Sequence, residues 1–125
     1  MAYDSLRGVT ILFGGDDRNG RNGETWEWDG AAWTLRATTG PSPRAHHALA
    51  YDSARGVTVL FGGKDRNMLN GETWEWDGAT WTPRASTGPS PREGHALAYD
   101  AARGVTVLFG GFTGYPNYEN GETWE

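Results

Sequence analysis

A 48-residue internal repeat is the feature that most constrains how this 125-residue chain can fold. Tyr3, Tyr51 and Tyr99 recur at that interval, and so does a pair of adjacent glycines. Residues 2–49 and 50–97 differ at ten positions, whereas the third copy, residues 98–125, has two extra residues between Gly111 and Glu122. A period of this length predicts a solenoid, a propeller or an array of small domains. We treat residues 1–125 as one segment of three repeats.

Each copy is predicted to contain four short strands and no helix. Residues 95–100 alternate small and larger side chains, and residues 56–63 are apolar on both faces. Residues 72–76 place two tryptophans on one face, Asp77–Gly78 predicts a type I′ hairpin turn, and residues 79–84 follow as a fourth strand. Pro83 cannot donate a backbone hydrogen bond, so the fourth strand is expected at a sheet edge. Each copy should therefore be an antiparallel meander.

A single sheet of this kind has an apolar face on each side and is not stable alone. Radial stacking covers each sheet with the next, which is the arrangement of a propeller. Ala96 and Ala98 suit a crowded strand near the axis, and Pro83 suits the rim. The repeated tryptophans are expected to fill the gaps between neighbouring blades, although they could also form a platform that stacks on sugars. We predict an all-β propeller segment of roughly two and a half to three blades.

Several residues carry a resemblance to the kelch repeat. The segment "REGHALAYD" precedes a strand that ends in a double glycine, and an aromatic hairpin with "TW" follows. The resemblance rests on Arg92, Gly94 and His95, on the paired glycines, and on Trp33 and Trp81. It covers nearly the whole chain and implies a propeller of the kind also found in the central domain of galactose oxidase. The sequence departs from the kelch pattern in having Trp28 and Trp76 in place of the usual tyrosine, and His46–His47 in place of the first Gly-His pair.

Composition excludes several classes of function. The formal net charge of −5 argues against nucleic acid, because a binder of polyanions normally has a basic face. No long apolar run and no signal peptide are visible, so we expect a soluble chain without a membrane partner, in a compartment that the sequence leaves open. The chain has no cysteine and therefore no disulfide or thiolate site.

Three sets of polar residues could carry chemistry. His47 and His95 share a repeat position and could serve a metal or acid–base site, but the kelch resemblance implies that they begin the inner strand. The carboxylates at the repeat positions of Glu72 and Asp52 are expected to bond backbone or arginine within their own blade, because a rotation around the ring holds equivalent carboxylates apart. Residues 16–24 lack the spacing of a calcium loop. We assign no catalytic residue, metal ligand or cofactor.

Differences between the copies cluster in the loops that follow the double glycines. Loops on a rigid scaffold are where binding usually occurs, and aromatic, methionine and arginine side chains suit a protein surface. A second variable cluster, Ala45–His46 against Glu93–Gly94, should emerge on the same face. Drift in solvent-exposed loops is the alternative explanation. The candidate binding residues are Asp16, Arg18, Arg21, Lys64, Arg66, Met68, Leu69, Phe112, Tyr115 and Tyr118.

We predict a non-enzymatic binding scaffold whose partner is a protein or peptide. The alternatives are the propeller part of an oxidase, epimerase or carbohydrate-active enzyme with its site outside this chain, and a purely structural repeat, natural or designed, without a ligand. A propeller needs about four to eight blades to close. In the repeat register about 22 residues separate residue 125 from the position of Met1 in a following copy. The chain is therefore expected to be a fragment or to associate head-to-tail into a closed ring rather than to form a compact monomer.

Overall fold

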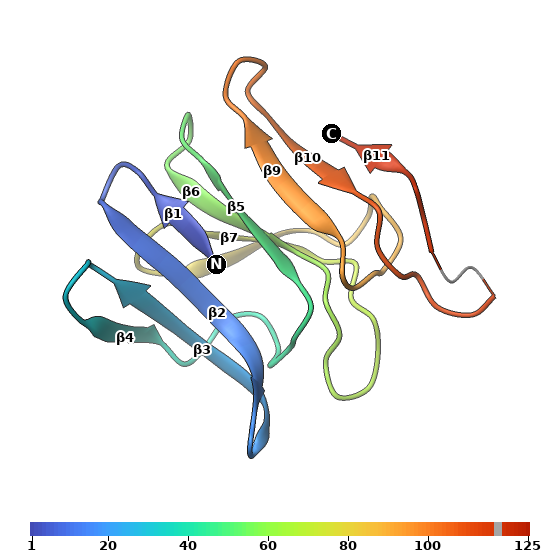
Figure 1. Cartoon of the computed structure of the whole chain (residues 1–125), viewed down its shortest axis with the longest axis horizontal. Helices are drawn as coiled ribbons and strands as arrows, with labels where there is room; N and C mark the ends of the chain where they lie inside the picture. The colour runs from blue at the N-terminus through green and yellow to red at the C-terminus, as the bar shows by residue number, and fades with distance from the viewer. Residues whose placement is uncertain (117–118) are drawn as a thin grey trace.

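The computed structural model describes residues 1–116 and 119–125, and these residues form three antiparallel sheets without a helix (Figure 1). The described part of the chain therefore contains no helix that could cross a membrane. The first sheet contains β1 (Ala2–Asp4), β2 (Val9–Asp17), β3 (Gly20–Trp28) and β4 (Trp33–Ala37). The second contains β5 (Ala48–Asp52), β6 (Val57–Phe61), β7 (Thr73–Trp76) and β8 (Trp81–Ala85). The third contains β9 (Ala96–Asp100), β10 (Val105–Phe109) and β11 (Thr123–Trp124).

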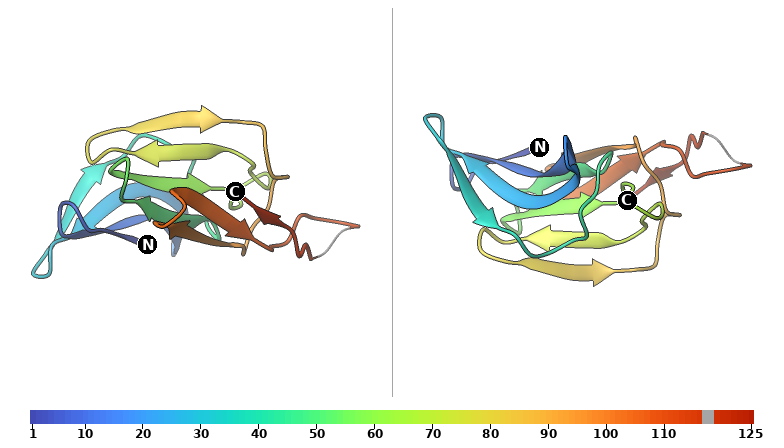
Figure 2. Two further views of the ribbon diagram at one scale, coloured as in Figure 1. Left: turned by 90° about the horizontal axis from the view of Figure 1, so that it is seen from above. Right: turned by 90° about the horizontal axis from the view of Figure 1, so that it is seen from below.

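The strands within each sheet pair in chain order, which confirms the predicted meander. In the second sheet β5 pairs with β6, β6 with β7, and β7 with β8. Figure 2 shows these green to yellow strands lying side by side. Strand β8 has a partner on one side alone, so Pro83 lies on the sheet edge, as expected from its missing N–H. The third sheet has the order β11-β10-β9.

The inner strands of the three sheets lie beside one another. Strand β5 contacts both β1 and β9, and Figure 1 shows the three sheets spreading outward from this point. The alanines of these strands permit the close approach because they carry the smallest side chain with a Cβ. The predicted fold class is confirmed: the chain is an all-β protein of propeller-like blades, two with four strands and the third with three in the described residues.

Trp81 fills the gap between the first and second sheets. Its ring packs edge-on against Phe13 of β2 at a centroid distance of 5.3 Å, and its Nε1 donates a hydrogen bond to Thr25 Oγ1 of β3 at 2.7 Å. Trp76 and Leu60 complete the buried cluster on the side of the second sheet. The expectation that tryptophans fill the space between blades is confirmed for Trp76 and Trp81.

The predicted type I′ turn between the third and fourth strands is wrong. The loop has four residues, 77–80, and Trp76 and Trp81 form the last pair of the ladder. A type I′ turn requires a positive φ at both Asp77 and Gly78. Gly78 has a φ of 97°, but Asp77 does not have a positive φ, since His46 is the one non-glycine residue in the described part of the chain that has it. The Asp77 carboxylate instead accepts hydrogen bonds from the backbone N–H of Ala79 and Thr80, both at 2.8 Å, and closes the turn as an Asx turn.

Candidate functional site

The loops after the double glycines and the connectors between sheets lie at the same end of the strands. Lys64 forms backbone bridges with Ala45 of the preceding connector and with Leu69 of its own loop. Phe112 forms the corresponding bridge with Glu93, with N–O distances of 2.8 and 3.0 Å. The two variable clusters therefore form one surface, which we call the loop face and which is the candidate site.

A buried arginine in each connector supports the loop face. The backbone of Arg44 is held by the first sheet, because its N–H donates to the Asn22 carbonyl and its carbonyl accepts from the Gly15 N–H. Its side chain, 1% exposed, reaches into the second sheet and donates to the Gly62 carbonyl at 3.1 Å and to the Glu72 carboxylate at 2.7 Å. One residue thus ties two sheets together beside the loops.

Arg92 repeats this arrangement between the second and third sheets. Its side chain is fully buried and donates to the Gly110 carbonyl at 2.9 Å and to the Glu122 carboxylate at 3.0 Å. The hydrogen bond from Arg44 lowers the pKa of Glu72. This role of the two arginines was not predicted from the sequence. The available signal was the segment "PSPR", which is identical in both connectors although the two residues that follow it differ.

The histidines are part of the packing between sheets. His47 and His95 each pack edge-on against the phenylalanine of the preceding sheet, Phe13 and Phe61, with centroids 5.4 Å apart. His95 Nε2 lies 3.1 Å from the Phe61 carbonyl, so this nitrogen is the donor and carries the proton. Burial lowers the pKa of both histidines to about 4, which keeps them neutral at pH 7. The interpretation that they begin the inner strands in a structural role agrees with these contacts.

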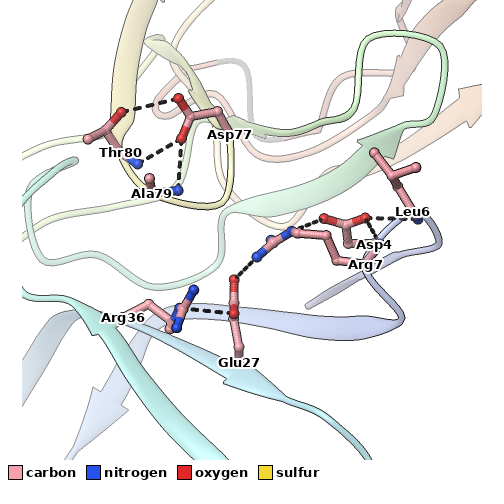
Figure 3. A network of polar contacts seen from close by, with 8 residues as sticks. All are labelled: Asp4, Leu6, Arg7, Glu27, Arg36, Asp77, Ala79 and Thr80. Atoms are coloured by element: carbon pink, nitrogen blue, oxygen red, sulfur yellow. Dashed lines mark hydrogen bonds and ion pairs between the residues drawn. The ribbon is translucent and has the colours of Figure 1, made fainter.

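The repeated aspartates close turns at the opposite end of the strands. Asp4 accepts from the backbone N–H of Leu6 and of Arg7, and its second oxygen binds Arg7 Nε at 2.7 Å (Figure 3). Arg7 also reaches Glu27, which Arg36 contacts from β4. Asp52 and Asp100 bind backbone and arginine in the same way, which confirms the predicted structural role of the aspartates. The prediction that Glu72 binds an arginine of its own blade is wrong, because its partner Arg44 belongs to the preceding copy. No group of three histidine, cysteine, aspartate or glutamate side chains with metal-binding geometry occurs in residues 1–116 and 119–125.

The first hollow of the loop face lies between the first two loops and has a volume of about 590 Å³. Arg21 crosses it: its guanidinium contacts the carbonyls of Lys64 and Asp65 and forms an ion pair with Asp16 at 3.3 Å. Arg66 also lines this hollow. Three of the predicted binding residues therefore meet in one place, and Arg21 has a second role in joining the first loop to the second.

A second, larger hollow of about 870 Å³ lies beside the third loop. Phe112, 36% exposed, and Phe109 supply its apolar wall, and Glu93 and Glu119 supply carboxylates. His46 borders the hollow from the preceding connector with a φ of 58°, and its carbonyl accepts a hydrogen bond from the Gly94 N–H at 2.9 Å. This connector residue was noted as variable in the sequence but was not among the candidate binding residues.

The remaining predicted residues differ in exposure. Met68 and Tyr115 are 61% and 84% exposed, and Arg18 is also exposed. Leu69 is half-buried instead of exposed, and a Cβ added to Gly114 would lie 3.7 Å from it, so the second and third loops contact each other. Tyr118 lies outside the described residues.

One sequence-based expectation about the first loop is wrong. Asp16 and Arg21 are not loop residues, because β2 and β3 extend past the double glycine and pair these two residues in the ladder. Gly20 has a φ of 113°, which permits the tight turn at residues 18 and 19. Met68 replaces this glycine in the second copy, where the ladder reduces to isolated bridges.

No protein-family model matches the sequence, and a comparison with curated proteins finds no match. The class of protein therefore follows from the fold and the site: an all-β protein of propeller-like blades that carries a variable loop face on a scaffold tied by buried arginines.

Proposed function

We propose that the chain is a kelch-like propeller segment that acts as a non-enzymatic scaffold and binds a protein or peptide through its loop face. The observation that carries this proposal is the contrast between scaffold and loops. Arg44 and Arg92 hold the same bonds in both connectors, whereas five of the ten positions that differ between the first two copies (16, 20, 21, 45 and 46) lie in the loop and connector segments that form the loop face.

The composition of the loop face favours a polypeptide partner. Exposed Met68, Phe112 and Tyr115 supply apolar contact area, and Arg18 and Arg66 lie on the neighbouring loops. Aromatic residues, methionine and arginine are enriched in protein interfaces, where they provide most of the binding free energy. The two hollows can receive side chains of a bound segment. The larger hollow has Glu93 and Glu119 in its lining and favours a basic side chain, whereas the first hollow has both carboxylates and arginines in its lining.

The experiment is a selection of peptides from a random display library on the immobilised chain. Binding of each selected peptide is then measured by fluorescence anisotropy against wild type, Met68→Ser and Tyr115→Ser. Leu6→Ser is the matched control, because Leu6 is 79% exposed but lies in the β1–β2 turn at the opposite end of the strands. The proposal expects roughly tenfold weaker binding for at least one loop variant and unchanged binding for the control. Peptides that bind all four proteins equally would contradict it.

A further inference from the structure

The contact between the first and second sheets has an aromatic part, to which the two sheets contribute different residues from different faces. Phe13 and Thr25 lie on the forward face of the first sheet, the face turned toward the second sheet. Trp81 lies on the rear face of the second sheet and meets both of them. Phe13 is 2% exposed and Trp81 9% exposed.

The same contact has a polar part near the β1–β2 turn. Tyr51 of the second sheet lies with its hydroxyl beside the Asp4 carboxylate of the first, and burial together with this carboxylate raises the pKa of Tyr51. The hairpin at Gly78 sits against Arg7, whose guanidinium would be 2.9 Å from a Cβ at that glycine (Figure 3 shows the adjacent Asp77 turn). Each pair again takes one residue from the first sheet or its β1–β2 turn and one from the second sheet or its β7–β8 turn.

The two end sheets display the separate halves of this contact. The repeat places Phe109, Thr123, Asp100 and Arg103 on the forward face of the third sheet, where the first sheet has Phe13, Thr25, Asp4 and Arg7. On the rear face of the first sheet it places Trp33, Tyr3 and Gly30, where the second sheet has Trp81, Tyr51 and Gly78.

The aromatic residues of the end sheets are more exposed than their counterparts: Phe13 and Trp81 are buried and Tyr51 is half-buried. Phe109 is 56% exposed, Trp33 44% and Tyr3 59%. A Cβ added to Gly30 would meet no atom within 4 Å, in contrast to Gly78. Leu35, on β4 beside Trp33, adds a further 42% exposed apolar side chain. Exposed large apolar side chains mark docking surfaces, and here one such surface lies on the forward face of the third sheet and the other on the rear face of the first sheet.

We propose that the partner of these two faces is a second copy of the chain, packed head-to-tail, so that the forward face of the third sheet of one copy meets the rear face of the first sheet of the other. Trp33 of one copy packs on Phe109 of the next and donates its Nε1 hydrogen to Thr123, while Tyr3 lies beside Asp100. The chain contains both halves of a contact that it already makes internally, and it presents them at opposite ends. The interface is therefore heterologous, and it closes into a ring if the rotation between sheets is maintained. This inference does not require the proposed peptide binding, although Phe109 also lines the larger hollow of the loop face.

The test is the mass in solution of the whole chain and of two charge variants. Analytical ultracentrifugation of the wild type should give a multiple of the 13.7 kDa chain mass at about 100 µM, with the multimer dissociating on dilution. Phe109→Arg and Trp33→Arg each place an unpaired charge in every interface of their own assembly, so each alone should weaken association by roughly tenfold or more.

A mixture of the two variants provides the decisive result. The intact forward face of Trp33→Arg can bind the intact rear face of Phe109→Arg, so equimolar mixing should restore a dimer. Met68→Arg, on the loop face, is the matched control and should associate as the wild type does. A wild-type chain that sediments with a single-chain mass at about 100 µM would overturn the inference. A mixture that stays monomeric after the wild type has associated would do the same, because it would mean that other surfaces make the contact.

Discussion

Arg44 donates its Nη2 hydrogen to the Glu72 carboxylate across 2.7 Å, from a backbone that belongs to the preceding sheet. The arginine is 1% exposed and its partner 43% exposed, so the pair consists of a desolvated cation and a half-solvated anion. Three further bonds from the same side chain, to Ser42 and Gly62, satisfy the guanidinium. The residue therefore acts as a structural tie between sheets and not only as an ion pair.

Replacement of Arg44 by alanine should destabilise the chain by about 2–4 kcal/mol, because it removes several buried hydrogen bonds and leaves a cavity. Arg36→Ala is the matched control. It also breaks an ion pair, with Glu27, but Arg36 is 42% exposed and the loss should be at most about 1 kcal/mol. Urea unfolding followed by tryptophan fluorescence measures both. Equal losses of unfolding free energy for the two variants would show that the bonds of Arg44 stabilise the chain no more than an exposed ion pair does.

Thr25→Val should cost about 1–3 kcal/mol although it preserves the shape of the side chain. The substitution leaves the buried Trp81 Nε1 without its acceptor, and an unsatisfied buried donor carries its full desolvation cost. Thr34→Val, on the exposed strand β4, removes a hydroxyl in solvent and should change the free energy of unfolding by less than about 0.5 kcal/mol. Denaturant titration separates the two cases, and an equal effect would argue against a dry contact between the sheets.

Stability should fall as the pH drops from about 6.5 toward 4. Burial lowers the pKa of His47 and His95 to about 4 in the folded chain, whereas the unfolded chain has the ordinary pKa of 6.5. The unfolded state therefore binds more protons in this window, and the contribution is fully present above pH 6.5 and lost on acidification. Each histidine can add a slope of up to about 1.4 kcal/mol per pH unit.

The histidine variant His95→Gln tests this assignment, since glutamine can still donate to the Phe61 carbonyl but does not titrate. Urea unfolding at pH 7, 6 and 5 should show a shallower loss for the variant than for the wild type. Parallel curves would place the acid sensitivity in other groups. The carboxylates with lowered pKa, such as Asp52 and Glu72, contribute their own loss at lower pH, as they become protonated.

Most of the fold could be predicted from the sequence because the repeat supplied the same evidence more than once. Alternation and β-branched runs gave the strands, and Pro83 gave the sheet edge. The turn at Asp77 could not be predicted from the Asp-Gly pair, because the carboxylate offers a different way to close the loop, through bonds to Ala79 and Thr80. The end of β2 depended on one residue, Gly20, whose backbone permits a turn that Met68 does not.

The site was predicted less completely than the fold. Differences between copies identified the loop face, because variation is tolerated where side chains are solvated. The role of Arg44 was missed because the identical "PSPR" segments mark a constrained position but do not show whether the arginine is exposed or buried. The connector residue His46 lies at the rim of the larger hollow because of a backbone conformation that the sequence does not reveal.

Two glycines with nearly the same backbone offer the most direct test of the contact between sheets. Gly30 and Gly78 have φ of 98° and 97°, so alanine at either position costs about 1–3 kcal/mol of backbone strain. A Cβ at Gly78 would also lie 2.9 Å from the Arg7 guanidinium, which Asp4 and Glu27 hold in place (Figure 3), whereas a Cβ at Gly30 would meet nothing within 4 Å. Gly78→Ala should therefore be less stable than Gly30→Ala by about 1 kcal/mol or more.

Arg7→Ala in the background of each glycine variant isolates the steric part of this difference. Removal of the guanidinium should bring the effects of the two alanines together, because backbone strain is then the cost they share. The four free energies of unfolding from each cycle are measured by urea titration, at a dilution where wild type and variants have the same mass. A difference between the two alanines that persists without Arg7 would mean that the hairpin of the second sheet does not press on the first sheet in the way described above.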